Sequence, residues 1–263
     1  MRRPRRRSTE RVHLNHELVL SNPAVQRVRR LAGRRTSRSE EGAFIVEGAV
    51  LVSEAVDAGW HVIEQFVAPG ADPISGAGAV RHLAPGVMDK IATTETPQPV
   101  LAVVERAFAG REILDTAGFV VVADGVADPG NLGTMLRSAE AAGSDCVVLT
   151  PGTVDPSNPK VVRASAGAVF RVPVVEDTNL DEVGLAGIVR LGTSSHRGAS
   201  HTDTDLRRRV AVVLGNEAHG LSDDADVVEW ITITHAGRSD SLNVAMACTV
   251  LCFEVARQRR SGS

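Results

Sequence analysis

The sequence predicts an α/β protein in two parts, a small α/β unit followed by a larger unit built on a parallel sheet. In the C-terminal half, apolar runs of strand length such as FVVVA, CVVL and VAVVL alternate with helical patterns. This alternation is typical of a parallel sheet covered by helices on both faces. A polar segment at 106–117 separates the two parts. With 263 residues and 43% hydrophobic content, the chain can bury a core in each part.

The first part is expected to begin with a helix over 23–32. There the letters SNP place Ser21 or Asn22 as a cap before Pro23, which suits a first helical turn. The pattern that follows predicts a strand at 43–48, a helix at 50–59, a strand at 62–68, a Gly- and Pro-rich patch at 69–86 and a strand at 100–105.

The second part reads as strands and helices in regular alternation. Together the two parts predict a basic arm at 1–21, a small domain at 22–106, a linker at 107–117 and a large domain at 118–263. In the large domain we expect strands at 119–124, 146–150, 172–175, 187–194, 210–217 and 230–235, and helices at 131–142, 159–166, 178–184 and 241–258.

Positive charge is concentrated at the N-terminus. Residues 1–38 hold twelve arginines against Glu10 and Glu17, although the whole chain has a net charge of -3. Such a split favours a polyanion as partner. The run MRRPRRR can equally be a solvated tail, whereas the later arginines lie on and just after a helix and are the better RNA-binding candidates: Arg27, Arg30, Arg34, Arg35 and Arg38.

Several function classes find no support in the sequence. Aromatic residues make up 3% and tyrosine is absent, which argues against an array of stacked rings that reads bases. P-loop, G-x-G-x-x-G and G-x-S-x-G spacings are missing. No apolar run reaches membrane-span length, and no secretory signal follows the arginines, so a cytoplasmic protein is expected. Cys146, Cys248 and Cys252 form no CxxC pair, and buried thiols explain the last two more simply than zinc with His219 and His235, so no metal is expected.

Unusual polar segments follow the predicted strands. They are DGVADPGN, GTSSH, GNEAHGL and HAGRSDSLN. Because ligands collect at the carboxyl ends of parallel strands, these segments predict the functional site.

Three of these regions carry a resemblance to a known family. The stretches DPGNLGTMLRSAEAAG, LGNEAHGLS and ITITHAGRSDSLNVAMACTVLCFE resemble, in that order, the motifs of the SpoU/TrmH family of RNA ribose 2′-O-methyltransferases in the SPOUT superfamily. The likeness covers about residues 118–258. The segment SNPAVQRVRRL, with EEGAFIVEG after it, is similar to the small α/β RNA-binding domain that often precedes this catalytic domain. The resemblance implies a trefoil-knotted α/β domain, an S-adenosylmethionine pocket, an RNA substrate and a homodimer formed through the knotted domain.

The resemblance also assigns residues. Asn131 and Arg137 would hold the acceptor nucleotide, and their six-residue spacing places them within about 120° on one helical wheel. Arg137 would bind phosphate and stabilise the developing alkoxide, since a guanidinium is an implausible base. Plainer readings are a helix cap for Asn131, a loop carboxylate for Glu217 and a capping segment for SDSLN. The implied catalytic set is Asn131, Arg137, Glu217, Ser241 and Asn243, and the implied cofactor-binding set is Leu191, Gly192, Thr193, Leu214, Gly215, Asn216, Ile233, Leu242, Asn243 and Ala245.

Two departures from the family pattern concern pocket shape and substrate. Relatives usually have I-P-M where this chain has Ile233, Thr234 and His235, and His219 stands in the second motif. The expected function is methyl transfer from S-adenosylmethionine to a ribose 2′-hydroxyl of ribosomal RNA. Alternatives are the same reaction on transfer RNA, methylation of another RNA position, and a non-catalytic RNA-binding protein of this fold.

Overall fold

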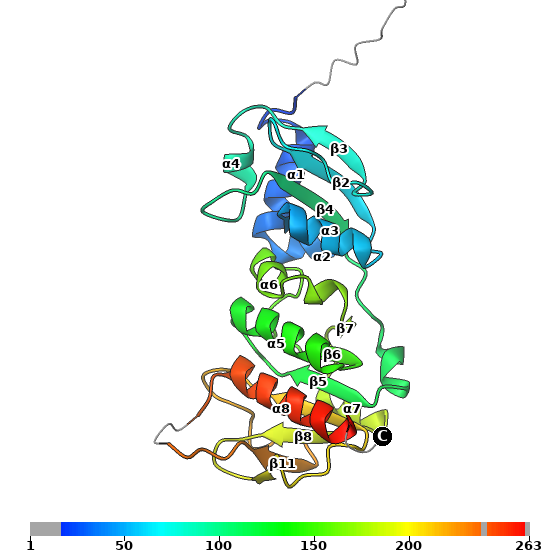
Figure 1. Cartoon of the computed structure of the whole chain (residues 1–263), viewed down its shortest axis with the longest axis vertical. Helices are drawn as coiled ribbons and strands as arrows, with labels where there is room; N and C mark the ends of the chain where they lie inside the picture. The colour runs from blue at the N-terminus through cyan, green and yellow to red at the C-terminus, as the bar shows by residue number, and fades with distance from the viewer. Residues whose placement is uncertain (1–16, 238–240, 261–263) are drawn as a thin grey trace, which may run out of the picture.

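The computed structural model describes residues 17–237 and 241–260, which form two sheets one above the other along the long axis of the molecule (Figure 1). The upper sheet has four strands in the order β1-β4-β2-β3, and the lower sheet has seven in the order β7-β6-β5-β10-β8-β11-β9. Within the described ranges, no helix is both long enough and apolar enough to cross a membrane.

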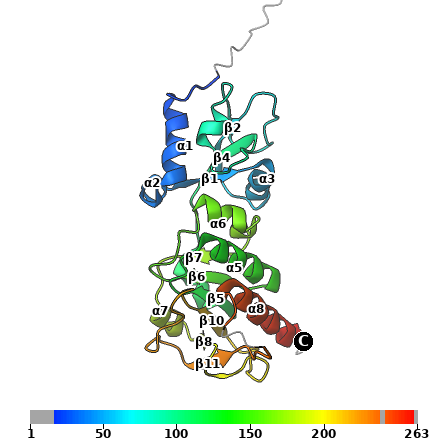
Figure 2. The same cartoon turned by 90° about the vertical axis from the view of Figure 1, so that its left-hand side faces the viewer.

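The upper sheet carries helices on both faces (Figure 2). Alternate residues of β1 divide between two cores: Ile45 packs with Val28 of α1, and Phe44 packs with Val52 of α3. α1 begins as predicted, with the Asn22 side chain accepting the Ala24 N–H and Pro23 in the first turn. The elements are α1 (Pro23–Gly33), α2 (Arg35–Glu41), β1 (Ala43–Glu47), α3 (Ala49–Asp57), β2 (Val62–Val67), β3 (Ala79–His82), α4 (Met88–Ile91) and β4 (Val100–Glu105).

The Gly- and Pro-rich patch contains a strand, β3, that was not predicted from the sequence. β3 pairs parallel with β2 at the sheet edge, and three of its four side chains are exposed, so it lacks an apolar signature. Gly78 has φ +63°, and a Cβ there would lie 2.3 Å from the Val62 carbonyl oxygen. Only glycine allows this approach, so turn residues are needed where the chain enters the strand.

All strands of the lower sheet are parallel, as predicted. Val121 of β5 lies opposite Val147 of β6 and Val212 of β10. The strands are β5 (Phe119–Ala123), β6 (Cys146–Leu149), β7 (Val174–Val175), β8 (Val189–Thr193), β9 (Ala199–Ser200), β10 (Val210–Leu214) and β11 (Glu229–Thr232).

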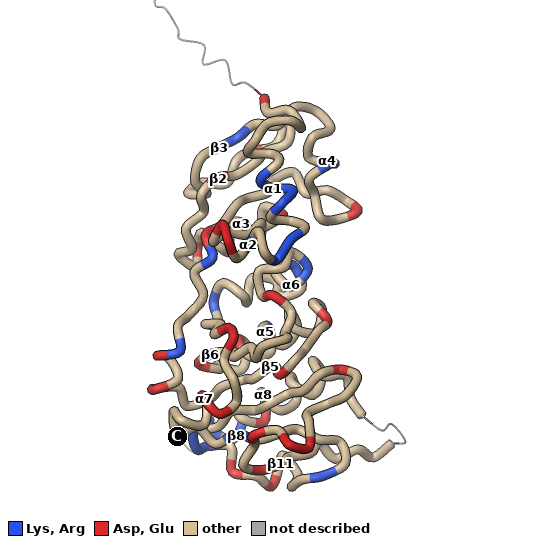
Figure 3. The backbone as a smooth tube through the Cα atoms, turned by 180° about the vertical axis from the view of Figure 1, so that it is seen from behind, with Lys and Arg blue, Asp and Glu red and all other residues tan. Residues whose placement is uncertain are grey.

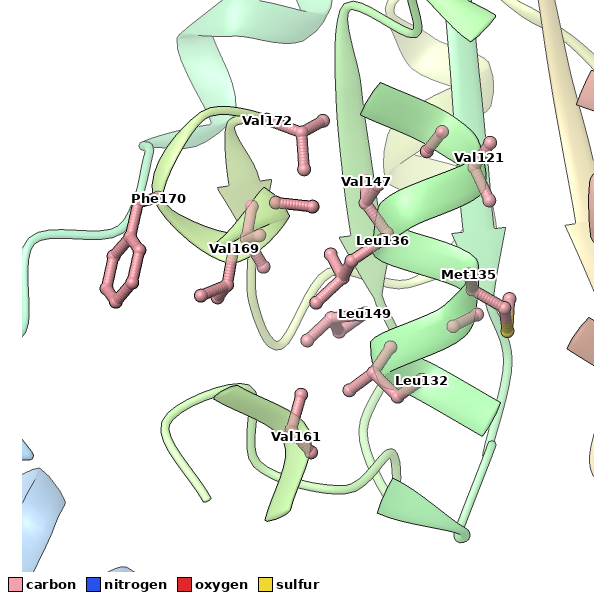
Figure 4. Packing of buried hydrophobic residues seen from close by; sticks show 14 of the residues in the cluster. Val121, Leu132, Met135, Leu136, Val147, Leu149, Val161, Val169, Phe170 and Val172 are labelled. Carbon is pink, nitrogen blue, oxygen red and sulfur yellow. The ribbon is translucent and has the colours of Figure 1, made fainter. Parts of the chain in front are cut away.

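Helices cover both faces of this sheet as well. On one face, Leu132, Met135 and Leu136 of α5 pack over Val121 and Val147 (Figure 4). α8 packs beside α5. α7 and the short helix η1 cover the other face. These elements are η1 (Arg111–Asp115), α5 (Pro129–Ala142), α6 (Pro159–Ala164), η2 (Ala168–Phe170), α7 (Leu180–Leu185) and α8 (Val244–Arg260).

The two sheets share one continuous core. Phe44 and Trp60 from the upper part pack against Phe170 of η2, with ring centroids 5.5–6.4 Å apart, and the Trp60 Nε1–H donates to the Phe170 carbonyl at 2.9 Å. Beside them, Arg38 of α2 and Asp155 of the lower part form an ion pair of 2.7 Å with both side chains only 4% exposed. The interface therefore combines aromatic packing with a buried charge pair.

Some element boundaries differ from the predictions. α8 begins at Val244 rather than 241, because the Asn243 side chain accepts the N–H groups of Ala245 and Met246. The segment expected to be a linker contains η1, whose Leu114 is buried against the sheet. Most of the basic arm lies outside the described residues. The knotted chain path and the four-part division of the chain stay predictions.

Candidate active site

A cavity of about 650 Å³ opens at the carboxyl ends of β8, β10 and β11. Its walls come from four segments that are distant in the sequence. These are residues 193–197 after β8, residues 214–221 and Asp223 after β10, residues 230–235 along and after β11, and residues 241–251 at the start of α8. Three of the four polar segments singled out in the sequence therefore meet here, as expected for a parallel sheet.

The loop after β10 forms a tight wall. Asn216 and Gly220 pair across it as an isolated bridge, and the Gly220 N–H donates to the Asn216 carbonyl at 2.8 Å. A Cβ on Gly215 would lie 2.3 Å from the Gly220 carbonyl carbon and 2.4 Å from the Leu221 nitrogen. Gly215 is thus required for the loop to close, and this leaves main-chain groups along the cavity.

A hydrogen-bonded network joins the three family motifs at the cavity rim. The Asn131 Nδ2–H donates to Glu217 Oε1 at 3.0 Å, and the Asn243 Nδ2–H donates to Asn131 Oδ1 at 3.0 Å. The main-chain N–H groups of Ala127 and Asp128 donate to the two Glu217 oxygens at 3.1 and 3.0 Å. Asn131 of the first motif is thus hydrogen-bonded to one residue of each of the other two motifs.

These contacts hold Glu217 in its anionic form. Partial burial raises the pKa of its carboxyl, but hydrogen bonds from Asn131, Asp128 and Ala127 outweigh burial and bring the pKa below its usual 4.5. Both oxygens already accept N–H groups, so Glu217 is better suited to hold the motifs together than to take a proton.

Asn216 and Asn243 also tie the loops to the fold. Asn216 donates its side-chain N–H to the Gly125 carbonyl at 2.9 Å and accepts the Ala218 N–H at 2.9 Å. Asn243 caps α8 while holding Asn131. The cap of α5 is Asp128 and not Asn131, whose side chain is thereby free for the network. The capping role proposed for SDSLN holds for Asn243, and it coexists with the site role.

Arg137 does not join this network. It is exposed on α5, does not line the cavity, and makes no hydrogen bond or ion pair with any described residue. Asn131 lies at the rim, and Arg137 lies about 9 Å farther along the helix axis. Within one chain, the two side chains expected to face the same cleft are not brought together.

The predicted cofactor residues separate into lining and supporting groups. Ala245 and Leu191 are buried in the core, and a Cβ on Gly192 would lie 3.0 Å from Val227. These three residues do not line the cavity but support the residues that do, because neighbouring side chains of a strand or helix point in different directions. The cavity is lined by the other seven: Thr193, Leu214, Gly215, Asn216, Ile233, Leu242 and Asn243. Of the predicted catalytic residues, Glu217 and Ser241 also line it.

Sequence reasoning missed an aromatic and charged group on the opposite wall. The Arg197 guanidinium lies 3.6 Å from the centre of the Trp230 ring and pairs with Asp223 at 2.8 Å. These residues and His196 line the cavity. GTSSH is one of the strand-end segments predicted to form the site, and Arg197 directly follows its last residue, His196.

A smaller cavity of about 380 Å³ adjoins this wall, between residues 195–198 and 232–235. His235 lines both cavities, and its buried Nε2 has no hydrogen-bond partner within 17–237 and 241–260. Cys248 and Cys252, with sulfurs 3.6 Å apart, are buried in α8, whereas His219 lines the main cavity. In the described part of the chain, no three metal-ligating side chains are grouped for an ion.

The predicted RNA-binding arginines differ in how far they are exposed and free of carboxylates that would compete with RNA. Arg38 is buried and paired with Asp155, so its assignment as an RNA contact is corrected; it joins the two halves of the chain. Arg27 pairs with Glu41 and Glu64, and Arg30 pairs with Glu41. Arg34 and Arg35 are exposed without a carboxylate partner among the described residues.

Comparison with known proteins agrees with this geometry. Residues 118–253 match the SpoU rRNA Methylase family, and residues 22–102 match the MRM3-like substrate binding domain. The 23S rRNA (guanosine(2553)-2′-O)-methyltransferase RlmP of Bacillus subtilis is 34% identical over 84% of this chain and 91% of its own length.

Solved structures share this fold over nearly the whole chain. The SpoU methyltransferase AviRb from Streptomyces viridochromogenes, in complex with AdoMet, superposes with a TM-score of 0.81 at 30% identity, covering 92% of this chain and all of AviRb. An AdoMet-bound rRNA methyltransferase from Sinorhizobium meliloti gives 0.80 at 30% identity, covering 91% of this chain and 96% of that one. The chain therefore belongs to the SpoU rRNA methylase family.

Proposed function

We propose that this protein transfers a methyl group from S-adenosylmethionine to a ribose 2′-hydroxyl of ribosomal RNA. The observation that carries the proposal is the network of Asn131, Glu217 and Asn243, which brings the three family motifs together at the mouth of a cavity. The names of full-length relatives, which describe ribose methylation of 23S rRNA, support ribosomal over transfer RNA.

The cavity suits the cofactor in size and chemistry. Leu214, Ile233 and Leu242 provide apolar surface, while the loop closed by Gly215 offers main-chain groups. A dry slot with a few polar groups is what binding of an adenine-containing ligand requires. The unpartnered His235 Nε2 adds a polar atom that a bound molecule can satisfy. When bound, S-adenosylmethionine supplies the electrophilic methyl group.

The side chains at the rim then have distinct roles. Asn131, Glu217 and Asn243 act as positioning residues, because Asn131 is hydrogen-bonded to both of the others. Arg137 remains the candidate for direct contact with the acceptor. Its guanidinium stays protonated, so it binds phosphate and stabilises negative charge as it develops on the 2′-oxygen. Ser241, just before α8, lines the cavity and would be available to a ligand bound there.

A homodimer is part of the proposal. On α8, an apolar stripe faces solvent at helical spacing, with Met246 63%, Val250 39% and Phe253 45% exposed. Pairing of two chains through this stripe would bury it. Light scattering tests the pairing. The unpaired thiols of the three cysteines are consistent with a reaction in the cytoplasm.

The function is tested by incubating the full chain with labelled S-adenosylmethionine and unmethylated RNA. Separate ribosomal and transfer RNA pools, and ribosomal particles, are then digested to nucleosides. Label in a 2′-O-methyl nucleoside from the ribosomal pool or particle is expected. Label only in transfer RNA would show that the substrate is transfer RNA and not ribosomal RNA. Cofactor binding without label in any pool would contradict the proposed acceptors, and absence of cofactor binding would favour a non-catalytic RNA-binding protein.

Arg137→Ala should abolish methyl transfer while leaving cofactor affinity within a few-fold of the wild type, because Arg137 lies outside the cavity. Calorimetry and the labelling assay measure the two properties separately. Arg207→Ala, an exposed arginine at the amino end of β10, is the control. An active Arg137→Ala variant would remove Arg137 from the mechanism.

A further inference from the structure

Cations without carboxylate partners gather along one side of the molecule. Figure 3 shows basic residues following one another down this side from α1 to α6. Elsewhere, most arginines are neutralised by ion pairs, among them Arg106, Arg111, Arg171, Arg190 and Arg208. The basic strip consists of exposed side chains that form no ion pair with a carboxylate among residues 17–237 and 241–260: Arg29, Arg34, Arg35, Arg137, Lys160 and Arg163.

Two members of the basic strip, Lys160 and Arg163, come from α6 in the catalytic domain. α6 packs on α5 at Gly133, where a Cβ would lie 2.4 Å from the Ala164 Cβ. Arg163 directly precedes Ala164, and Arg137 follows Gly133 by four residues, about 6 Å along α5. The α6 cations and Arg137 therefore lie on two helices that pack directly against each other.

The same helix also borders the upper domain. The Arg163 Nη1–H donates to the Thr93 hydroxyl at 3.3 Å. The loop that leads into α6 is tied to α2, because Arg38 pairs with Asp155 and the Arg35 Nη1–H donates to the Thr153 carbonyl at 3.4 Å. α6 thus lies between the arginines of α1 and α2 and the candidate catalytic Arg137, in a position set by buried contacts.

We infer that Lys160 and Arg163 bind backbone phosphates of the RNA strand where it passes from the α1–α2 arginines to the acceptor nucleotide at Arg137. This inference rests on the proposed function and adds two residues of the catalytic domain to RNA binding. It also makes the basic strip one continuous path across both domains.

The chemistry of the basic strip specifies phosphate rather than bases. The sequences of α1, α2, α5 and α6 contain no aromatic residue, so they offer no ring on which a base could stack. Ammonium and guanidinium groups exposed in a row match the spaced charges of a phosphodiester backbone.

The test replaces both charges in the full-length chain. Lys160→Gln with Arg163→Gln should weaken binding of the methylatable RNA on the order of 10-fold near 0.1 M salt. It should also lower the salt slope of log K by about 1.4, corresponding to two phosphate contacts on a single strand. KM for RNA should rise with kcat little changed, and cofactor affinity should stay at the wild-type value. The control, Arg207→Gln with Arg260→Gln, removes two exposed cations away from the basic strip and should leave the slope unchanged.

A charge-preserving variant separates phosphate binding from structural damage. Lys160→Arg with Arg163→Lys should restore the affinity and the salt slope. An unchanged slope in the double Gln variant of an active enzyme would overturn the inference while leaving the proposed function intact. A slope lowered equally by the control would overturn it too. If the wild-type chain methylates no RNA, the proposed function fails instead, and RNA affinity and slope still report on the basic strip.

Discussion

Arg38 and Asp155 meet at the interface between the two sheets with both side chains 4% exposed, whereas Glu217 meets Asn131 at a solvent-exposed cavity rim. Both places link segments far apart in the sequence by charged hydrogen bonds. The interface adds a shared apolar core, while the rim relies on the hydrogen bonds themselves. We therefore expect loss of the polar contact at the interface to affect mainly stability, and loss of the one at the rim to affect mainly methyl transfer.

The sharpest test of this contrast is Arg38→Met. It leaves the Asp155 carboxylate buried without its cation and should lower the free energy of unfolding by about 3–5 kcal/mol. Denaturant unfolding measures the change. Arg30→Met is the matched control, because Arg30 is 51% exposed in its pair with Glu41, and it should cost at most about 1 kcal/mol. Equal losses of unfolding free energy in the two variants would contradict the special contribution of the buried pair to stability.

A smaller effect is expected from Gly215→Ala, which tests the cavity wall. The added methyl would come within 2.3 Å of Gly220, so the loop must move, at a cost of about 1–3 kcal/mol. Cofactor affinity measured by calorimetry should fall with it. Gly33→Ala, where the added Cβ meets open space, should change neither quantity appreciably. Normal cofactor binding by Gly215→Ala would show that the shape of this loop does not determine cofactor binding.

The smallest change in stability, about 1 kcal/mol or less, is expected for Glu217→Gln. An amide cannot accept all the N–H groups that point at the carboxylate, so methyl transfer should fall at least about 10-fold. Since the folded-state pKa of Glu217 is lowered, its stabilisation is present above pH 4.5 and is lost as pH falls through the folded-state pKa. The stability difference between wild type and variant should vanish in acid. Glu95→Gln, an exposed carboxylate, is the control, and full activity of Glu217→Gln would contradict the positioning role.

The sequence predicted what depends on local pattern and on recognisable motifs. Buried parallel strands such as FVVVA and VAVVL were located, as was the Asn22-capped α1. The resemblance assigned Asn131, Glu217 and Asn243, which the structure joins directly. Their functional roles stay predictions.

What could not be predicted depends on contacts distant in the sequence. The partner of Arg38 is 117 residues away, so its burial left no local sign, and a surface arginine was expected. β3 is an exposed edge strand without apolar alternation. The pairing of Arg197 with Trp230 requires β8 and β11 to be neighbours, which only the sheet order reveals.

The buried pair of Arg38 and Asp155 has a consequence for which nucleotide is chosen. It fixes the span between the helices proposed to grip RNA and the cavity where the methyl group would be transferred. On the proposed function, the protein then holds a fixed distance between its RNA-binding helices and the site of methyl transfer. The modified nucleotide would be the one that folded RNA presents at a set distance from the gripped backbone, so RNA shape more than base sequence would define the target.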